Sequence, residues 1–166
     1  MNLGLSDQLK EAFFEIKKRK ITPKDIPSLL NPYWVAGFTE AEGCFWIKSF
    51  KDSTKNKLST VLGFQITQHN RDLLLMERLI SFFNCGRIEK TNTAYSLVVT
   101  KLSFINENII PFFNTYPILG FKYKDYKDWC KAVELKNNKT HLTPEGLEEI
   151  LKIKFSINSS RLKIKD

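Results

Sequence analysis

The sequence predicts an α+β fold in which a helix and two strands are followed by another helix, two more strands and several trailing helices. Three observations predict it: a capped helix at residues 31–43 that ends at a glycine, alternating segments joined by polar turns, and an apolar helix between the two pairs of strands. Because strands joined by short turns pair antiparallel, we expect one four-stranded antiparallel sheet. The chain of 166 residues can bury one substantial core and gives no sign of a second complete domain.

The helix that opens the first pair of strands has clear start and stop signals. Asn31 is a favourable N-cap, Pro32 suits the first helical position, and Gly43 breaks the helix. Ala36 and Gly37 leave almost no side chain on one face. Since the distance between packed helices depends on the side chains at their contact, this face is expected to approach another helix closely.

An earlier segment is predicted to form a short amphipathic helix. Ser6 is a suitable cap, and the helix ends in the basic run at 17–20. Its apolar face consists of Leu9, Ala12, Phe13 and Ile16. Three acidic residues also lie in this segment, whereas transit peptides are poor in acids, so no targeting peptide is predicted.

The first two strands are expected to form a hairpin. Residues 44–50 alternate, and a second strand runs from about 58 to 68 after the polar turn at 51–57. The side chains assigned to the core are Phe45, Ile47, Leu62, Phe64 and Ile66. The first strand carries apolar residues on both faces, so its periodicity alone does not choose the buried face.

A helix and a second pair of strands come next. Asn70 can cap a helix that reaches Phe83 and packs behind the sheet through a broad apolar face. Strands are predicted at 87–90 and 95–100. Their core-facing side chains are expected to be Ile88, Tyr95, Leu97 and Val99.

Three further helices are predicted after the sheet. The first, capped by Ser103, either stops at Pro111 or continues with a kink. The second opens within residues 117–129, and the third is capped by Thr143 and Pro144. In the second helix Tyr126, Trp129 and Ala132 are assigned to the core, and the third has Leu147, Ile150, Leu151 and Phe155 on its apolar side.

Composition favours a folded basic domain with nucleic acid as its leading partner. The formal net charge is +8, and the chain contains 13 Phe, 5 Tyr and 3 Trp. No apolar run approaches the roughly 20 residues of a membrane span. The three cysteines are widely spaced and odd in number, which argues against a disulfide framework or a cysteine zinc site. His69 and His141 lack partners at metal-ligand spacing, so they are interpreted as surface or capping residues.

The segment VAGFTEAEG, Val35 to Gly43, resembles the LAGLIDADG motif of the homing endonucleases. In that family two such helices pack at the centre of a dimer or pseudo-dimer, and the last acidic residue of each binds the divalent metals used in DNA cleavage. The resemblance implies the αββαββα LAGLIDADG fold with a saddle-shaped sheet. The segment NLGLSDQLKEAF, residues 2–13, is similar to the connector before the second repeat of double-motif fungal mitochondrial members.

The resemblance implies a catalytic site. Glu42 and the backbone carbonyl of Ala41 would bind Mg²⁺, or another divalent cation such as Mn²⁺ or Ca²⁺, all of which prefer oxygen ligands. Gln68, at the end of FQITQ, would position a water, and Lys122, in GFK, would stabilise developing negative charge. Glu40 is assigned to hydrogen bonding rather than to the metal. The residues assigned to a dimer interface are Trp34, Val35, Ala36, Gly37, Phe38 and Glu40.

The outward face of the sheet is expected to lie over the DNA major groove. If Glu42 points at the DNA, the side chains two, four, six and eight residues further on follow it to the same side. Arg87 suits guanine, Gln65 suits adenine, and Glu89 suits cytosine, while Val61 or Val98 suits a thymine methyl group. The expected DNA contacts are Cys44, Trp46, Lys48, Phe50, Lys51, Ser59, Val61, Gly63, Gln65, Thr67, Arg87, Glu89, Thr91, Ser96, Val98 and Thr100.

The sequence therefore predicts a site-specific, metal-dependent DNA endonuclease that acts as a homodimer on a roughly palindromic double-stranded target of about 20 base pairs. As in the family it resembles, it would leave double-strand breaks with 3′ overhangs. Two alternatives stay open: a maturase-like protein that binds intron RNA without cleaving, and an inactive natural or engineered half of a double-motif enzyme. The predicted organisation is an N-terminal helix and connector at 1–30, the endonuclease domain at 31–158 and a basic tail at 159–166. If the chain is natural, it is expected to be encoded and made in mitochondria.

Overall fold

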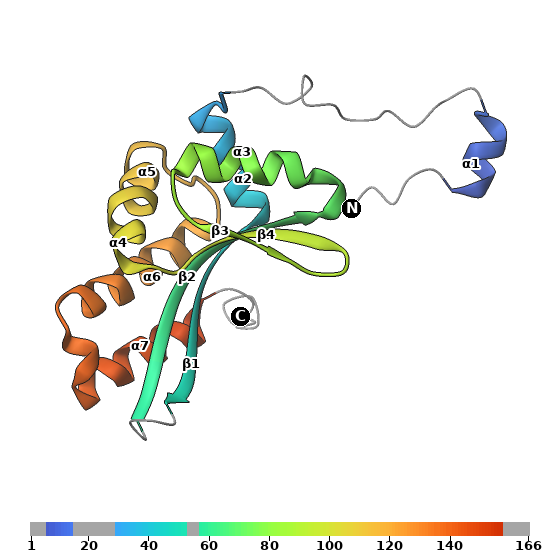
Figure 1. Cartoon of the computed structure of the whole chain (residues 1–166). Coiled ribbons are helices and arrows are strands. Elements are labelled where there is room, and N and C mark those ends of the chain that lie inside the picture. Colours follow the sequence, from blue (N-terminus) through green and yellow to red (C-terminus); the bar gives the residue numbers. More distant parts are fainter. Residues whose placement is uncertain (1–5, 15–28, 53–56, 158–166) are drawn as a thin grey trace.

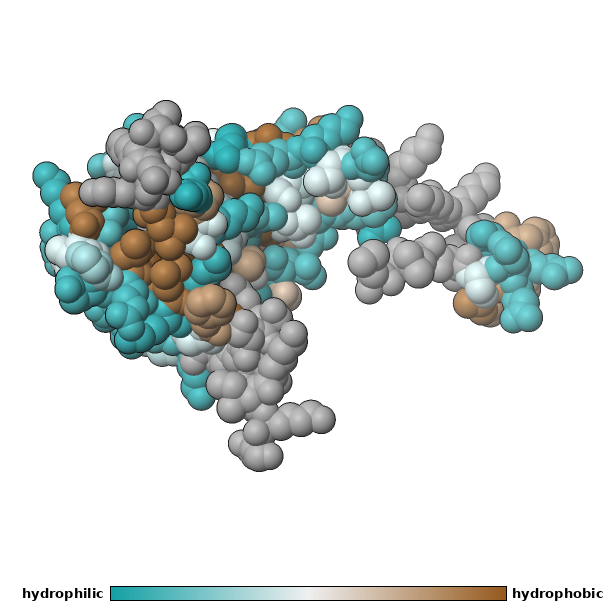
Figure 2. Space-filling view, turned by 90° about the horizontal axis from the view of Figure 1, so that it is seen from below, coloured by the Kyte–Doolittle hydropathy of each residue, from teal (hydrophilic) through white to brown (hydrophobic). Residues whose placement is uncertain are grey.

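The fold is a curved four-stranded antiparallel sheet with the helices that follow α1 gathered on one side of it, whereas α1 is drawn apart from them (Figure 1). The face seen in Figure 2 is largely hydrophilic and exposes a group of hydrophobic residues. The structure is a computed structural model that describes residues 6–14, 29–52 and 57–157, except the side chains of residues 52 and 57. The basic run at 17–20, most of the turn at 51–57 and the tail at 159–166 lie outside the described residues. None of the helices in the described ranges combines the length and apolar character needed to cross a bilayer.

The elements follow the predicted order. They are α1 (Asp7–Ala12), α2 (Pro32–Glu42), β1 (Gly43–Asp52), β2 (Lys57–His69), the 3₁₀ turn η1 (Asn70–Asp72), α3 (Leu73–Phe83), β3 (Arg87–Lys90), β4 (Ala94–Val99), α4 (Leu102–Phe104), the π-helical turn η2 (Ile105–Ile109), α5 (Ile110–Thr115), α6 (Lys122–Asn137), the 3₁₀ turn η3 (Thr140–Leu142) and α7 (Pro144–Ser156). The predicted α+β class is confirmed.

Helix α2 begins and ends as the sequence predicts. The Oδ1 atom of Asn31 accepts hydrogen bonds from the backbone N–H groups of Tyr33 (2.9 Å) and Trp34 (3.3 Å), which have no partner inside the helix. At the other end the N–H of Gly43 donates to the Thr39 carbonyl, and the chain turns directly into β1. A Cβ at residue 43 would lie 2.5 Å from Thr39 Cγ2, so a glycine permits this abrupt turn.

The sheet has the strand order β1-β2-β4-β3, and its register pairs Gly43 with Ile66 and Phe64 with Val99. Burial alternates along β1 as predicted, because successive side chains point to opposite faces, whereas residues 96–99 of β4 are all buried. The buried core-facing residues are Phe45, Ile47, Leu62, Phe64, Ile66, Leu97 and Val99, with Ile88 and Tyr95 packed against them. Burial thus resolves the face of β1 that periodicity left open.

Aromatic side chains join the sheet to the helices behind it. The ring of Phe45 lies 5.2 Å from Trp129 and Tyr126 and 5.7 Å from Phe113, measured between centroids. The indole N–H of Trp129 donates to the carbonyl of Trp46 (3.3 Å), so this buried polar group is satisfied. The core assignment of Tyr126, Trp129 and Ala132 is confirmed.

Two predicted caps are wrong. The Nδ1 atom of His69, rather than Asn70, accepts from the Arg71 N–H (3.3 Å) at the start of η1. Lys101 rather than Ser103 occupies the cap position before α4, without a side-chain hydrogen bond. The first turns begin one and two residues earlier than predicted, and no side chain caps the turn after Lys101, so residue type alone did not mark these starts.

The helix around Pro111 continues instead of stopping at the proline. Before Pro111 the N–H of Ile110 donates to the Ile105 carbonyl, which widens the turn where the proline lacks a donor.

The last helix, α7, buries a different face from the one predicted. Phe155 is 70% exposed, so its assignment to the apolar side is wrong. The buried residues of α7 are Gly146, Ile150 and Ile153.

Candidate active site and nucleic-acid interface

The end of α2 and the beginning of α6 hold each other through reciprocal hydrogen bonds. The Lys122 ammonium donates to the backbone carbonyls of Thr39 (3.2 Å) and Gly43 (2.5 Å). In return, the Lys122 backbone N–H donates to Glu40 Oε1 (3.3 Å). A cation therefore lies at the C-terminus of α2 and a carboxylate at the N-terminus of α6, where each helix dipole favours it. Gly120 permits the contact, since a Cβ there would lie 2.3 Å from Glu40 Oε1.

Lys122 also lies within electrostatic reach of Glu42. Burial lowers the pKa of Lys122, and the carboxylates of Glu40 and Glu42 oppose this shift. Glu42 itself is exposed at the last position of α2. Two of the three ammonium hydrogens are bound to carbonyl oxygens, so one remains for an added oxygen ligand such as a phosphate.

Gln68 belongs to the same end of the β1–β2 hairpin. Gly43 pairs with Ile66, so the residue two positions further along β2 lies beside the end of α2. Gln68 is half-buried there and pairs with Tyr95 on β4. The structure therefore brings the three predicted catalytic residues to one end of the sheet.

The donors at the end of α2 suit part of a divalent-metal site. Both Ala41 and Glu42 are exposed, and the carbonyl of Ala41 is among the last four of the helix, which lack an amide partner within it. Mg²⁺ takes one or two carboxylates and completes its shell with water and substrate phosphate. Across the described ranges no three His, Cys, Asp or Glu residues cluster as a metal site. One Glu42 is therefore an incomplete donor set that needs substrate or another chain.

One side of α2 is open to solvent. Tyr33 is 71% exposed and Trp34 44%, and Gly37 and Ala41 are also exposed. A Cβ added at Gly37 would meet nothing within 4 Å. We call these four residues, which follow one another along the helix at helical spacing, the open strip of α2.

The predicted dimer interface needs correction. Val35 and Ala36 are 0% and 5% exposed and face the core of their own chain, so they are not available to another helix. Phe38 is half-buried and stacks on Trp34, with ring centroids 4.8 Å apart. Glu40 is used within the chain by Lys122. Of the six predicted residues, Trp34 and Gly37 lie on the open strip.

The outward face of the sheet is less accessible in places than the sequence predicts. Ser96 and Val98 are 5% and 2% exposed, and the side chains of Gln65 and Thr67 on the neighbouring strand contact Ser96. Gly63 is buried under the indole of Trp46, since a Cβ there would lie 2.1 Å from Trp46 Cζ2. The other predicted contacts are half-buried or exposed: Cys44, Trp46, Lys48, Phe50, Lys51, Ser59, Val61, Gln65, Thr67, Arg87, Glu89, Thr91 and Thr100.

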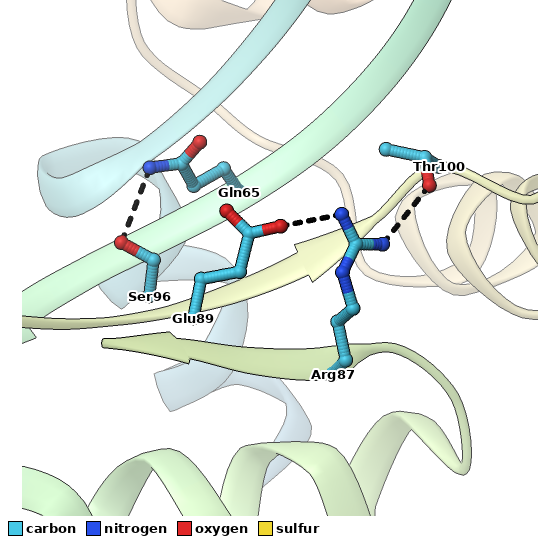
Figure 3. Close-up of polar contacts among 5 residues, drawn as sticks. All are labelled: Gln65, Arg87, Glu89, Ser96 and Thr100. Atoms are coloured by element: carbon cyan, nitrogen blue, oxygen red, sulfur yellow. Dashed lines mark hydrogen bonds and ion pairs between the residues drawn. The ribbon is translucent and has the colours of Figure 1, made fainter. Parts of the chain in front are cut away.

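Polar side chains on this face are bonded to one another (Figure 3). Arg87 forms an ion pair with Glu89 through Nη2 and donates from Nη1 to Thr100 Oγ1 (3.1 Å). Gln65 donates to Ser96 Oγ (3.2 Å) on the neighbouring strand. The Arg87–Glu89 pair lies within β3, whereas the contacts to Thr100 and Ser96 join residues 13 and 31 positions apart, which no periodic pattern predicts.

The family model described as LAGLIDADG endonuclease matches residues 35–133, which include most of α2, the sheet and most of α6. The chain belongs to the LAGLIDADG endonuclease family. The fold and the resemblance identified in the sequence are thereby confirmed.

Relatives and solved structures agree with this membership. Probable intron-encoded endonuclease 2 of Neurospora crassa is 40% identical over 169 residues, which is 95% of this chain and 36% of that protein. Probable intron-encoded endonuclease 3 of the same fungus is 39% identical over 158 residues, 90% of this chain and 29% of that protein. The meganuclease I-SmaMI bound to uncleavable DNA is 44% identical with a TM-score of 0.85, covering 97% of this chain and 54% of that one. The chain thus spans about a third of these two curated relatives.

Lys122→Met is expected to weaken both the fold and activity. The variant loses two charge-assisted hydrogen bonds, each worth about 1.5–3 kcal/mol, but also avoids burying a charge, so we expect the free energy of unfolding to fall by about 1–3 kcal/mol in total. Urea denaturation checks this value. Lys124→Met, which changes an exposed lysine of the same helix, should remain within about 0.5 kcal/mol of the parent. Equal stability of the two variants would contradict the structural role of Lys122.

Proposed function

We propose that this chain is the DNA-cleaving unit of a site-specific homing endonuclease that makes double-strand breaks with 3′ overhangs. The observation that carries the proposal is the exposed Glu42 carboxylate beside Lys122, at the foot of a helix with an open apolar strip. Relatives named intron-encoded endonucleases support it, as do I-SmaMI structures described as bound to cleaved DNA and to an uncleaved target with calcium ions.

The outward face of the sheet is the proposed DNA-binding surface. The chain carries a net charge of +8, which favours binding to the phosphate backbone. Arg87, Glu89 and Gln65 offer exposed or half-buried polar groups to base edges. Ser96, Val98 and Gly63 are too buried to contact DNA, so we leave them out of the proposed reading set.

At the cleavage centre the oxygen donors of Glu42 and Ala41 would hold a divalent cation. When bound, that cation supplies charge neutralisation and lowers the pKa of a water ligand. Lys122 would use its remaining hydrogen to bind a phosphate oxygen and stabilise the negative charge that develops on it. Gln68 would orient the attacking water through its side-chain amide.

A second unit is needed to cut the second strand. We propose that it is another copy of this chain, docked with the open strip of α2 against its own symmetry mate, because a two-fold contact is self-complementary. A second repeat within one longer chain would meet the same requirement, and the chain covers only 54% of the I-SmaMI structure. We further propose a mitochondrial origin, since relatives include the cox1 intron-2 protein of Schizosaccharomyces pombe and the mitochondrial protein RF1 of Saccharomyces cerevisiae.

Cleavage of a randomised palindromic DNA library, measured together with solution mass, tests this proposal. We expect a dimer that cuts with Mg²⁺, leaves 3′ overhangs and loses activity in EDTA. Cleavage without any divalent metal would contradict the assigned site. A chain that stays monomeric and inactive at all concentrations, but cuts when joined to a second repeat, would reject the homodimer and retain the cleavage unit.

A further inference from the structure

Three side chains on the outward face of the sheet form a closed hydrogen-bonded triangle. Gln65 Nε2 lies 2.9 Å from Thr67 Oγ1 and 3.2 Å from Ser96 Oγ, and the two hydroxyl oxygens lie 2.8 Å apart. Thr67 and Ser96 are directly opposite each other on β2 and β4. Ser96 is 5% exposed, so its position is fixed by the sheet around it. We call this group the Gln65 triangle.

Counting hydrogens fixes the orientation of the Gln65 amide. Three mutual contacts need three hydrogens, and the hydroxyls of Thr67 and Ser96 supply one each. If the amide nitrogen faces them, it supplies two hydrogens and one hydroxyl supplies the third, so every contact is a hydrogen bond. If the amide were reversed, its oxygen would supply none, and the two hydroxyl hydrogens could not satisfy three contacts.

The nitrogen of the Gln65 amide is therefore turned towards the hydroxyls of Thr67 and Ser96. The carbonyl oxygen takes no part in the triangle, and Figure 3 shows it pointing away from Ser96. A glutamine that recognises adenine by two hydrogen bonds needs a free N–H for the N7 atom as well as a free oxygen for the N6 amino group. In this chain the amide nitrogen faces the hydroxyls of Thr67 and Ser96, so the oxygen is the atom of the amide presented to a base.

We infer that Gln65 acts as a hydrogen-bond acceptor alone and selects an amino group in the major groove, so that adenine or cytosine is accepted on the contacted strand and guanine or thymine is rejected. Adenine and cytosine carry amino groups at N6 and N4, whereas guanine and thymine carry oxygens there that would face the Gln65 oxygen. Thr67 and Ser96 are positioning residues for this selection. The inference rests on the proposed DNA-binding role of this face and replaces the expectation that Gln65 reads adenine only.

Selection of bound sequences from a randomised DNA pool, without added metal, tests the inference. The parent chain should enrich adenine and cytosine to similar extents at one position, about twofold or more above guanine and thymine, because a single hydrogen bond contributes at least about that factor. Gln65→Met, which has similar length and no hydrogen-bonding amide, should lose preference at that position alone.

The variant Thr67→Val/Ser96→Ala releases the amide while leaving Gln65 in place. Adenine should then be enriched over cytosine at the same position by about fivefold or more, since the two-bond contact becomes available. If Ser96→Ala reduces folding, as shown by circular dichroism, Thr67→Val alone should still raise the adenine-to-cytosine ratio. Gln65→Glu, which has acceptor oxygens only, should keep both adenine and cytosine.

Two failures can be told apart. If the parent enriches no sequence, the proposed DNA-binding function fails and the inference fails with it. If sequences are enriched but the position sensitive to Gln65→Met shows adenine alone, guanine or thymine, the inference is overturned while the function stands. An adenine-to-cytosine ratio that Thr67→Val/Ser96→Ala leaves unchanged would overturn the positioning role.

Discussion

Glu42→Gln is expected to reduce the cleavage rate at least about a hundredfold while DNA binding changes little, because losing a metal ligand should exceed the roughly 10–100-fold cost of losing an outer hydrogen-bond partner. The amide is nearly the same size, and Glu42 is exposed, so the fold should be unaffected. Single-turnover cleavage at saturating protein and increasing Mg²⁺ measures the effect.

Glu77→Gln is the matched control for this loss. Glu77 is an exposed carboxylate on α3, outside the site, and its replacement should leave cleavage within about twofold, as for most surface substitutions. Glu40→Gln distinguishes the role of Glu40 from that of Glu42, because its amide oxygen can still accept the hydrogen bond from the Lys122 N–H. Retention of more than a tenth of the parent rate by Glu42→Gln would rule out Glu42 as the metal ligand.

Gly37→Leu is expected to give a folded monomer that does not cut. A glycine inside a helix is less favourable than alanine by about 1 kcal/mol, and a side chain at this position meets nothing within 4 Å, so the monomer should be as stable as the parent or slightly more stable. The added side chain would hold apart two helices that dock through the open strip of α2. Sedimentation equilibrium, with urea denaturation at low concentration, measures both effects.

Substitutions of graded size make this test sharper. Gly37→Ala should weaken association less than Gly37→Leu, because the distance between packed helices follows the size of the residues at their contact. Ser81→Leu adds the same side chain at an exposed position of α3 and should leave association unchanged. A Gly37→Leu dissociation constant within about threefold of the parent would exclude the open strip as the docking surface.

The sequence predicted best those features of the fold that depend on residues close together along the chain. The cap of Asn31 on α2 and the strand at 87–90 were predicted from local signals, and both are present. Ala36 was wrongly assigned to a helix interface because a small residue permits close packing on either side of a helix. Only the tertiary structure shows that it faces the core of its own chain.

The residues of the candidate site were likewise predicted only in part. The family resemblance pointed to Glu42 and Lys122, and their proximity agrees with it. The Glu40 contact with the backbone of Lys122 joins residues 82 positions apart, and no periodic pattern predicts such a pair. The burial of Ser96 was missed because alternation gives the direction of a side chain but not how far the side chains around it cover it.

The acceptors that hold Lys122 have a consequence for how this protein tolerates mutation. Both are main-chain carbonyls, of Thr39 and Gly43, and every amino acid provides such an oxygen. Substitutions along the helix can therefore accumulate without displacing the lysine, provided that the helix still ends at the same turn. The proposed cleavage end of the molecule therefore depends little on which side chains the helix carries, whereas the proposed base contacts on the strands depend on particular side chains.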